Sequence, residues 1–268
     1  MSVKCYDIIK IMEEYAPLKM AESWDNVGLM LGDENADLKM VLTALDINDN
    51  VIDEAINIGA DMIITHHPFI FKPIKNIKYS DAQGRRIIKL IKNNISVYSS
   101  HTNLDIAKGG TNDTICNILG LNNVSGLIEC EDKINYLGRV GFLKKDMTLT
   151  EFSEYVKLKL KLNVVSVSGN GNTIVKKVGV CTGKASGSVY MNAAKLLGCD
   201  VYLTGDVGYH DAQYALDIGL CVVDATHYAL EVCITNVLCR YMNEYANKNG
   251  LNFKCKASEL NIETFNYI

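Results

Sequence analysis

An internal repeat constrains this chain more than any other feature of its sequence. The octapeptides GADMIITH at 59–66 and GCDVYLTG at 198–205 share a glycine, an aspartate and a threonine at matching positions. A second pair, SHTNLD at 100–105 and THYALE at 226–231, has a hydroxyl residue, then histidine, then a carboxylate four positions on. Self-similarity of this kind predicts two copies of one supersecondary unit.

The spacing of the two matches is reconciled by one insertion. His66 and Gly205 are 139 residues apart, whereas His101 and His227 are 126 apart. The difference of 13 is the length of Pro68–Ser80, a segment without a counterpart in the second half. We therefore predict a duplicated α/β unit, with the paired strand ends related by an approximate two-fold axis.

Short apolar, β-branched runs alternate with helical patterns, which is typical of α/β folds. The runs at 40–45, 62–65 and 95–98 predict strands; residues 50–58 and a segment capped by Asp81 predict helices. We expect two pseudo-repeated α/β halves with mixed sheets packed together. The expected domain is 1–268, with approximate halves 1–128 and 129–268 that share one metal site.

Composition and charge exclude several function classes. A net charge of -4 offers no general field for nucleic acid. No run approaches the roughly 18 apolar residues of a membrane span. Nine scattered cysteines without a Cys-x-x-Cys pair favour a reducing compartment, with the thiols as small core residues. We expect a cytoplasmic protein that binds neither nucleic acid nor membrane.

The histidines are not scattered. All five follow predicted strands of the repeat within a few residues: His66, His67, His101, His210 and His227. In open α/β sheets, ligands bind beyond the carboxyl ends of the strands. Imidazole and carboxylate donors that converge there suit divalent transition metals.

A two-metal centre is the interpretation that accounts for most of these donors. The expected ligands are His66, His67, Asp105, His227 and Glu231. His227 and Glu231 stand four apart on a predicted helix and share one face. Adjacent side chains on an extended chain diverge. His66 and His67 would therefore each serve a different ion. Five donors, two of them carboxylates able to bridge, fit two ions roughly 3.5–4 Å apart better than one. The alternative is a set of hydrogen-bonded polar turn residues.

Further residues have open roles. His101 is a candidate sixth donor or a catalytic acid/base. His210 is a candidate catalytic residue that orients a substrate or a water, with Asp206 accepting its ring proton; a purely structural role is the alternative. The only tryptophan, Trp24, precedes Asp25 and Asn26, and this turn either packs or lines the crevice.

Taken in order, these motifs resemble the NIF-three-like family, whose members are widely named GTP cyclohydrolase 1 type 2 homologs. The resemblance covers nearly the whole chain and runs through ESWDNVGL (22–29), HHP (66–68) with FKPIK (71–75), HTNLD (101–105) with GG (109–110), LTGD (203–206) with YHDA (209–212), and HYALE (227–231). It implies a NIF-three-like fold, a toroidal homohexamer, and two divalent cations per subunit on the same five ligands, with Glu231 bridging. One departure is Thr226, where the family usually has glycine.

The resemblance implies a dinuclear, divalent-metal-dependent hydrolase with a small-molecule substrate that the sequence does not name. Zinc, iron, manganese and nickel all suit the donors. The alternative is a non-catalytic protein for metal binding or delivery, or for regulatory interaction. Such a protein should release its metal to a competitor, whereas an enzyme should retain it.

Overall fold

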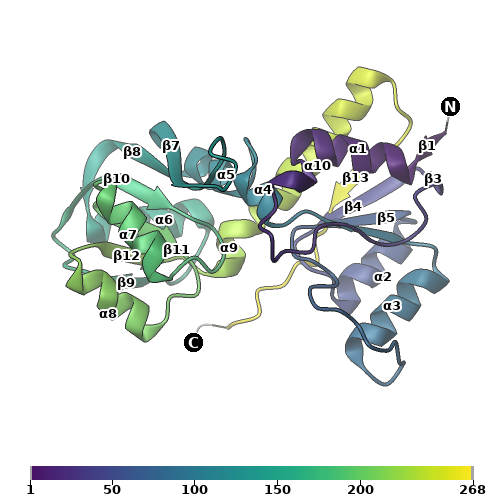
Figure 1. Ribbon diagram of the computed structural model, residues 1–268, viewed down its shortest axis with the longest axis horizontal. Coiled ribbons are helices and arrows are strands. Elements are labelled where there is room, and N and C mark those ends of the chain that lie inside the picture. The colour runs from purple at the N-terminus through teal and green to yellow at the C-terminus, as the bar shows by residue number, and fades with distance from the viewer. Residues whose placement is uncertain (1, 267–268) are drawn as a thin grey trace. The chain divides into compact units, whose positions relative to one another are not determined.

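The computed structural model describes residues 2–266, which form two compact units (Figure 1). Unit 1 comprises the described residues up to Ala107 together with Ile234–Ile262. Unit 2 comprises Lys108–Cys233 and the described tail from Glu263 to Asn266. Each unit has its own sheet and its own hydrophobic core.

Unit 1 is built on a five-stranded mixed sheet. Its strands, in spatial order, are β13 (Lys254–Ala257), β4 (Met40–Ala44), β5 (Met62–Thr65), β6 (Ser96–Ser99) and β2 (Gly28–Leu31). The first four run parallel and β2 pairs antiparallel with β6. A separate ribbon pairs β1 (Val3–Lys4) with β3 (Asp37–Leu38).

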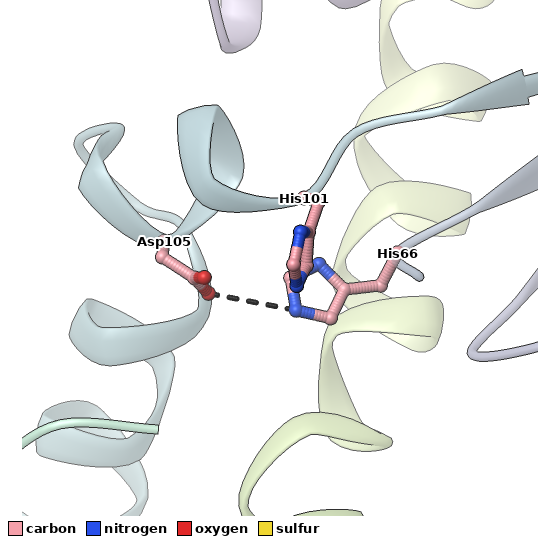
Figure 2. Close-up of side chains that lie close together, drawn as sticks. All are labelled: His66, His101 and Asp105. Carbon is pink, nitrogen blue, oxygen red and sulfur yellow. Dashed lines mark ion pairs between the residues drawn. The ribbon is translucent and has the colours of Figure 1, made fainter. Parts of the chain in front are cut away.

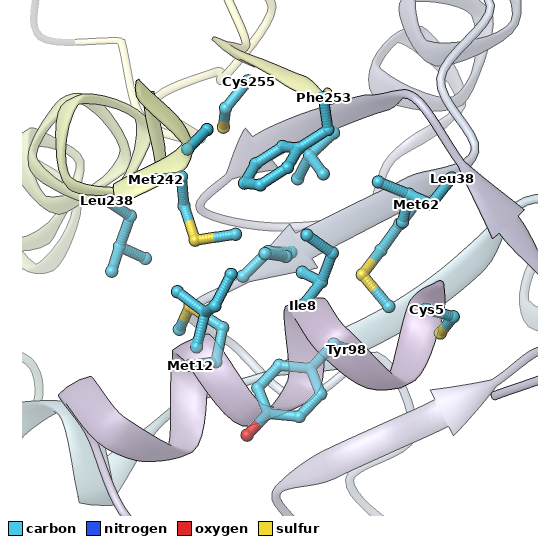
Figure 3. Packing of buried hydrophobic residues seen from close by; sticks show 14 of the residues in the cluster. Cys5, Ile8, Met12, Leu38, Met62, Tyr98, Leu238, Met242, Phe253 and Cys255 are labelled. Atoms are coloured by element: carbon cyan, nitrogen blue, oxygen red, sulfur yellow. The ribbon is translucent and has the colours of Figure 1, made fainter. Parts of the chain in front are cut away.

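Helices cover both faces of this sheet. Helices α1 (Cys5–Tyr15) and α10 (Cys233–Asn249) pack on one face with Met62 and Ile64, as Figure 3 shows for part of the cluster. Helices α2 (Asp49–Asn57) and α3 (Ala82–Lys92) pack on the other with Ile63. Successive strand residues point to opposite faces, so a continuous apolar strand fills both layers.

Unit 2 has a six-stranded mixed sheet of the same design. Its strands, in spatial order, are β7 (Asn122–Glu129), β8 (Tyr136–Thr148), β10 (Ile174–Val180), β11 (Val201–Thr204), β12 (Cys221–Asp224) and β9 (Ser166–Ser168). Strands β10, β11 and β12 are parallel, and the others pair antiparallel. Helices α5 (Thr111–Leu119) and α6 (Leu149–Leu160) share one core, and α7 (Ser188–Leu196) and α8 (Tyr209–Asp217) share the other.

The α/β class with mixed sheets is confirmed, and the topology explains the sequence repeat. The order β4-β5-β6-β2 in unit 1 matches β10-β11-β12-β9 in unit 2, with the same strand directions. A five-residue helix follows the last parallel strand in each unit: α4 (Thr102–Ile106) after β6, and α9 (His227–Glu231) after β12. These two short helices carry the predicted carboxylates.

Polar side chains fix several helix starts where the sequence placed them. Asp81 accepts a hydrogen bond from the Gly84 N–H (2.6 Å) at the start of α3, and Asn48 accepts one from the Val51 N–H (2.9 Å) at the start of α2. Thr148 and Glu151 form a reciprocal capping box on α6. Such caps satisfy amide groups that the first helical turn leaves open.

Among residues 2–266, no helix is both long enough and apolar enough to cross a membrane. The nine cysteines are free thiols.

Candidate metal centre

His66 lies at the carboxyl end of β5 and is fully buried. Its Nδ1 lies 2.9 Å from the carbonyl oxygen of Ser100, at the end of the neighbouring strand β6. A carbonyl oxygen only accepts, so Nδ1 carries the proton and Nε2 keeps the lone pair. The Nε2 atom lies 3.5 Å from Asp105 Oδ1.

His66, His101 and Asp105 converge within unit 1 (Figure 2). One ligand atom from each of the three side chains lies within 4.8 Å of the others. His101 precedes α4 as its N-cap residue, and Asp105 sits in that helix with 7% of its surface exposed. Two imidazoles and one carboxylate are a donor set that divalent transition metals accept.

His67 joins this group more closely than sequence reasoning expected. Its ring centroid lies 5.2 Å from that of His66 and 5.8 Å from that of His101. Adjacent side chains were expected to diverge on an extended chain, but the strand ends at Thr65 and the backbone bends at His66 and His67. The Thr65 hydroxyl donates to the His67 carbonyl oxygen (2.8 Å) and stabilises the bend.

Asp25 holds His101 in place at the start of α4. Its side chain is fully buried, and its carboxylate lies 3.0 Å from His101 Nδ1 while accepting hydrogen bonds from the Thr102 N–H and hydroxyl. Burial alone would raise the pKa of this carboxyl group, but the hydrogen bonds from His101 and Thr102 outweigh it and lower the pKa to about 2. Asp25 is therefore ionised at neutral pH.

Trp24 precedes Asp25 in the same turn and is largely exposed. Its ring centroid lies 6.1 Å from that of His101 and 6.2 Å from that of Phe71, edge-on in both cases. The sequence left open whether this turn packs or lines the crevice. In the structure, Asp25 holds His101, a candidate donor, and Trp24 lies beside the His101 ring.

Unit 2 holds the second group of predicted donors. His227 Nε2 lies 2.9 Å from Glu231 Oε2, as expected for residues four apart at the start of a helix. Glu231 is 2% exposed, although its carboxylate faces the histidine. A Cβ atom on Gly183 would lie 2.5 Å from Glu231 Oε1, so this loop position accepts only glycine without displacing the carboxylate.

Asp206 contacts His227 rather than His210. The carboxylate lies 2.9 Å from His227 Nδ1 and follows β11 at the position that matches His67 in unit 1. The sequence-based assignment of Asp206 to His210 is therefore wrong; Asp206 orients a predicted ligand instead. His210 is exposed in the first turn of α8, where its ring contacts Tyr209.

One pattern unites the four histidines other than His210. Each places Nδ1 within 3.0 Å of an oxygen acceptor: Ser100 O for His66, Asp46 for His67, Asp25 for His101 and Asp206 for His227. Metal-binding histidines are held in this way, because the acceptor fixes the tautomer and directs Nε2 to the ion. The donor set of His66, His101 and Asp105 therefore fits a divalent metal.

Comparisons with known proteins point in one direction. The sequence model of the family described as Duf34/NIF3 (NGG1p interacting factor 3) matches residues 3–263. A protein from Clostridium acetobutylicum named GTP cyclohydrolase 1 type 2 homolog is 37% identical over 269 residues, covering 100% of both chains. One of the same name from Clostridium perfringens is 40% identical over 232 residues, covering 85% of this chain and 87% of the relative.

Solved structures agree with the sequence matches. The Bacillus cereus protein related to NIF3 superposes with a TM-score of 0.94 at 29% identity, covering 100% of both chains. Reduced HcgD from Methanocaldococcus jannaschii superposes with a TM-score of 0.79 at 32% identity, covering 97% of this chain and 99% of that one.

Proposed function

This chain belongs to the Duf34/NIF3 family, and from that premise we propose that it is a hydrolase that depends on two divalent metal ions and acts on a small molecule. The relatives named GTP cyclohydrolase 1 type 2 homolog make GTP the first substrate to test. We propose as metal ligands the five residues that the sequence analysis selected: His66, His67 and Asp105 in unit 1, and His227 and Glu231 in unit 2.

The observation that carries this proposal is the control of the histidine tautomers. Four histidines have Nδ1 bound to an oxygen acceptor, three of them through the carboxylates of Asp46, Asp25 and Asp206. A set of merely structural histidines would have no reason to share an oxygen acceptor at Nδ1 at the ends of repeated strands. The convergence of His66, His101 and Asp105 supports the same conclusion.

The residues around the donors supply the remaining chemistry. When bound, a divalent ion polarises a substrate oxygen and lowers the pKa of a water molecule toward neutrality. Asp25, ionised at neutral pH, holds the His101 ring by Nδ1 and leaves Nε2 to exchange a proton with the reacting group. His101 thus serves either as acid/base or as a sixth donor, while exposed His210 would orient the substrate.

Metal binding can be followed through the single tryptophan. Because Trp24 borders His101 at 6.1 Å between ring centroids, a paramagnetic ion such as Co²⁺ at the centre should quench its fluorescence, whereas Zn²⁺ should compete without the same quenching. Elemental analysis of the purified protein should give two divalent ions per chain. Asp105→Asn and Glu231→Gln should each weaken binding by at least about tenfold, because loss of even an outer partner of a metal ligand has an effect of that size.

A control variant separates ligand loss from a general change of charge. Glu154→Gln removes a carboxylate that pairs with Lys157 on the exposed face of α6 and should bind Co²⁺ as the unaltered chain does. Equal quenching in Asp105→Asn and Glu154→Gln would remove Asp105 from the ligand set. His101→Ala should lower turnover without loss of metal if His101 is an acid/base, and lower both if it is a donor.

Turnover distinguishes the enzyme from its alternative. The metal-loaded chain should open or hydrolyse GTP, or another phosphate or amide compound, faster than Asp105→Asn does. A delivery protein, the alternative consistent with a family named for an interaction, would show no such difference and would release its ions to a chelator within minutes. That pair of results would overturn the hydrolase proposal.

A further inference from the structure

A thiol pair lies in unit 1 between α10 and the edge strand β13. Cys239 and Asn243 stand four apart on α10, so they share one face of the helix. The Asn243 side-chain amide donates to the Cys255 carbonyl oxygen (2.8 Å) and accepts from the Cys255 N–H (2.9 Å). Asn243 thus occupies the outer edge of β13, which has β4 as its neighbour on the other side, and holds Cys239 against Cys255.

The sulfur of Cys239 is surrounded by hydrogen-bonding groups. As a thiol, Cys239 donates to the Cys255 carbonyl oxygen (3.3 Å). Asn243 Nδ2 lies 3.6 Å from this sulfur and is directed at it. A side-chain amide donor held at this distance from a sulfur stabilises its thiolate form.

The two thiols are unequal partners. The hydrogen bond from the Cys255 thiol, opposed by partial burial, lowers the pKa of Cys239, and the Ala257 N–H and Asn243 lower it further. The same hydrogen bond, with burial, raises the pKa of Cys255. Cys239 is half-buried and Cys255 is buried, so the cysteine with the lowered pKa is also the more exposed residue.

Three other cysteines, Cys5, Cys116 and Cys199, lie in a different environment. Burial raises the pKa of the Cys116 and Cys199 thiols to about 12, and it raises the pKa of Cys5 as well. These thiols behave as small core side chains, as the sequence predicts for cysteines in general. The α10–β13 pair departs from that expectation.

We propose that Cys239 and Cys255 form a peroxide-oxidisable site, separate from the candidate metal centre. The Cys239 thiolate attacks one oxygen of a hydroperoxide, the O–O bond breaks, and Cys239 becomes a sulfenic acid while the second oxygen leaves and is protonated. The Cys255 sulfur then attacks the Cys239 sulfur, and the hydroxyl group leaves as water with the Cys255 proton. Two thiols are oxidised by two electrons, one hydrogen peroxide is reduced to two waters, and a disulfide joins α10 to β13.

Peroxide treatment of the full chain, with metal removed by a chelator, tests the site. Non-reducing peptide mapping should recover residues 239 and 255 in one disulfide-linked pair. In Cys255→Ser, residue 239 should accumulate sulfenic acid that dimedone traps, because the resolving thiol is missing. In Cys239→Ser, residue 255 should remain reduced under the same treatment.

Two further variants address reactivity and folding. Cys130→Ser removes another half-buried thiol and should leave the 239–255 disulfide unchanged. Iodoacetamide at neutral pH should label Cys239 several-fold faster than Cys130, and Asn243→Ala should reduce that advantage in a chain whose circular dichroism is unaltered. Equal labelling of Cys239 and Cys130, or peroxide products at 239 that never include the link to 255, would overturn the proposal. Neither outcome bears on the metal proposal.

Discussion

Thr226, immediately before His227, has a strained backbone. Its backbone has φ 63° and ψ 148°, a region that L side chains rarely adopt and that β-branched residues tolerate poorly. Its hydroxyl accepts a hydrogen bond from the Ala229 N–H (3.2 Å) and so caps α9. Glycine, which the family resemblance implies at this position, is the residue that this conformation favours.

Thr226→Gly should therefore stabilise the protein. Relief of strain, about 1–3 kcal/mol, should exceed the few tenths lost with the cap and the added entropy of the unfolded chain, roughly 0.4–1 kcal/mol. Urea unfolding should show a gain of about 1 kcal/mol. Thr226→Ala keeps the strained backbone and loses the cap, so it should be about 1 kcal/mol less stable than the unaltered chain. Loss of stability in the glycine variant would contradict this account.

Asp25 should make stability depend on pH. Its pKa in the folded chain is about 2, below the ordinary 3.8. As pH falls, the carboxylate of the folded chain is therefore protonated at a lower pH than that of the unfolded chain. The resulting stability is fully present above about pH 4 and is lost as pH falls from there toward 2. In metal-free protein, Asp25→Asn should lower the urea midpoint at pH 6, and the difference should narrow below pH 4. If the difference between the two urea midpoints stays constant from pH 6 to 3, the ionised carboxylate is not its cause.

Sequence reasoning at this scale selected the donors, but it did not show which residue orients each of them. His66, His101 and Asp105 were identifiable because they follow apolar strands of a repeat. Asp25 lies 76 residues from His101, and a spacing of this kind carries no periodic signal. Asp46 and Asp206 could have been identified from the sequence, because each lies two positions after the end of a parallel strand. Only the folded chain shows which histidine each one holds.

At the scale of elements, the helix that follows each repeat in the chain packs in the other unit. Helix α5 follows the unit 1 helix α4 in the chain but packs with α6 in unit 2. Helix α10 follows the unit 2 helix α9 but packs with α1 in unit 1. The strands could be predicted from their apolar runs, but this exchange could not. Both α1 in unit 1 and α5 in unit 2 have an apolar face, so the sequence does not show with which of them α10 packs.

The exchange predicts a reciprocal pattern of destabilisation. Leu238 on α10 and Ile115 on α5 are both buried in the core of the unit that receives their helix. Truncation to alanine should cost about 2–5 kcal/mol in either case. Hydrogen exchange in Leu238→Ala should rise in α1 and β4–β6, and in Ile115→Ala it should rise in α6 and β10–β12. Loss of protection confined to the elements adjacent in sequence would contradict the exchanged packing.

At the scale of the whole molecule, the two repeats differ in what they expose. Helices α7 and α8 of unit 2 present Val189, Leu196, Tyr209 and Leu216 to solvent, with Leu196 87% exposed. Their counterparts in unit 1, α2 and α3, carry ion pairs instead, such as Lys89 with Asp53 and Arg86 with Asp49. The α7–α8 layer thus exposes more large apolar side chains than its counterpart, and exposed apolar patches mark interaction surfaces.

We expect that layer to contact a second copy of the chain in the homohexamer that the family resemblance implies. Light scattering coupled to gel filtration should give six times the 29.7 kDa chain mass. Leu196→Glu places a charge in the apolar layer and should shift the mass toward smaller species, because an unpaired charge is costly to bury. Lys248→Glu changes charge in the last turn of α10 and should leave the mass unchanged. A hexamer that persists in Leu196→Glu would move the interface away from α7, and a monomeric unaltered chain would reject the assembly itself.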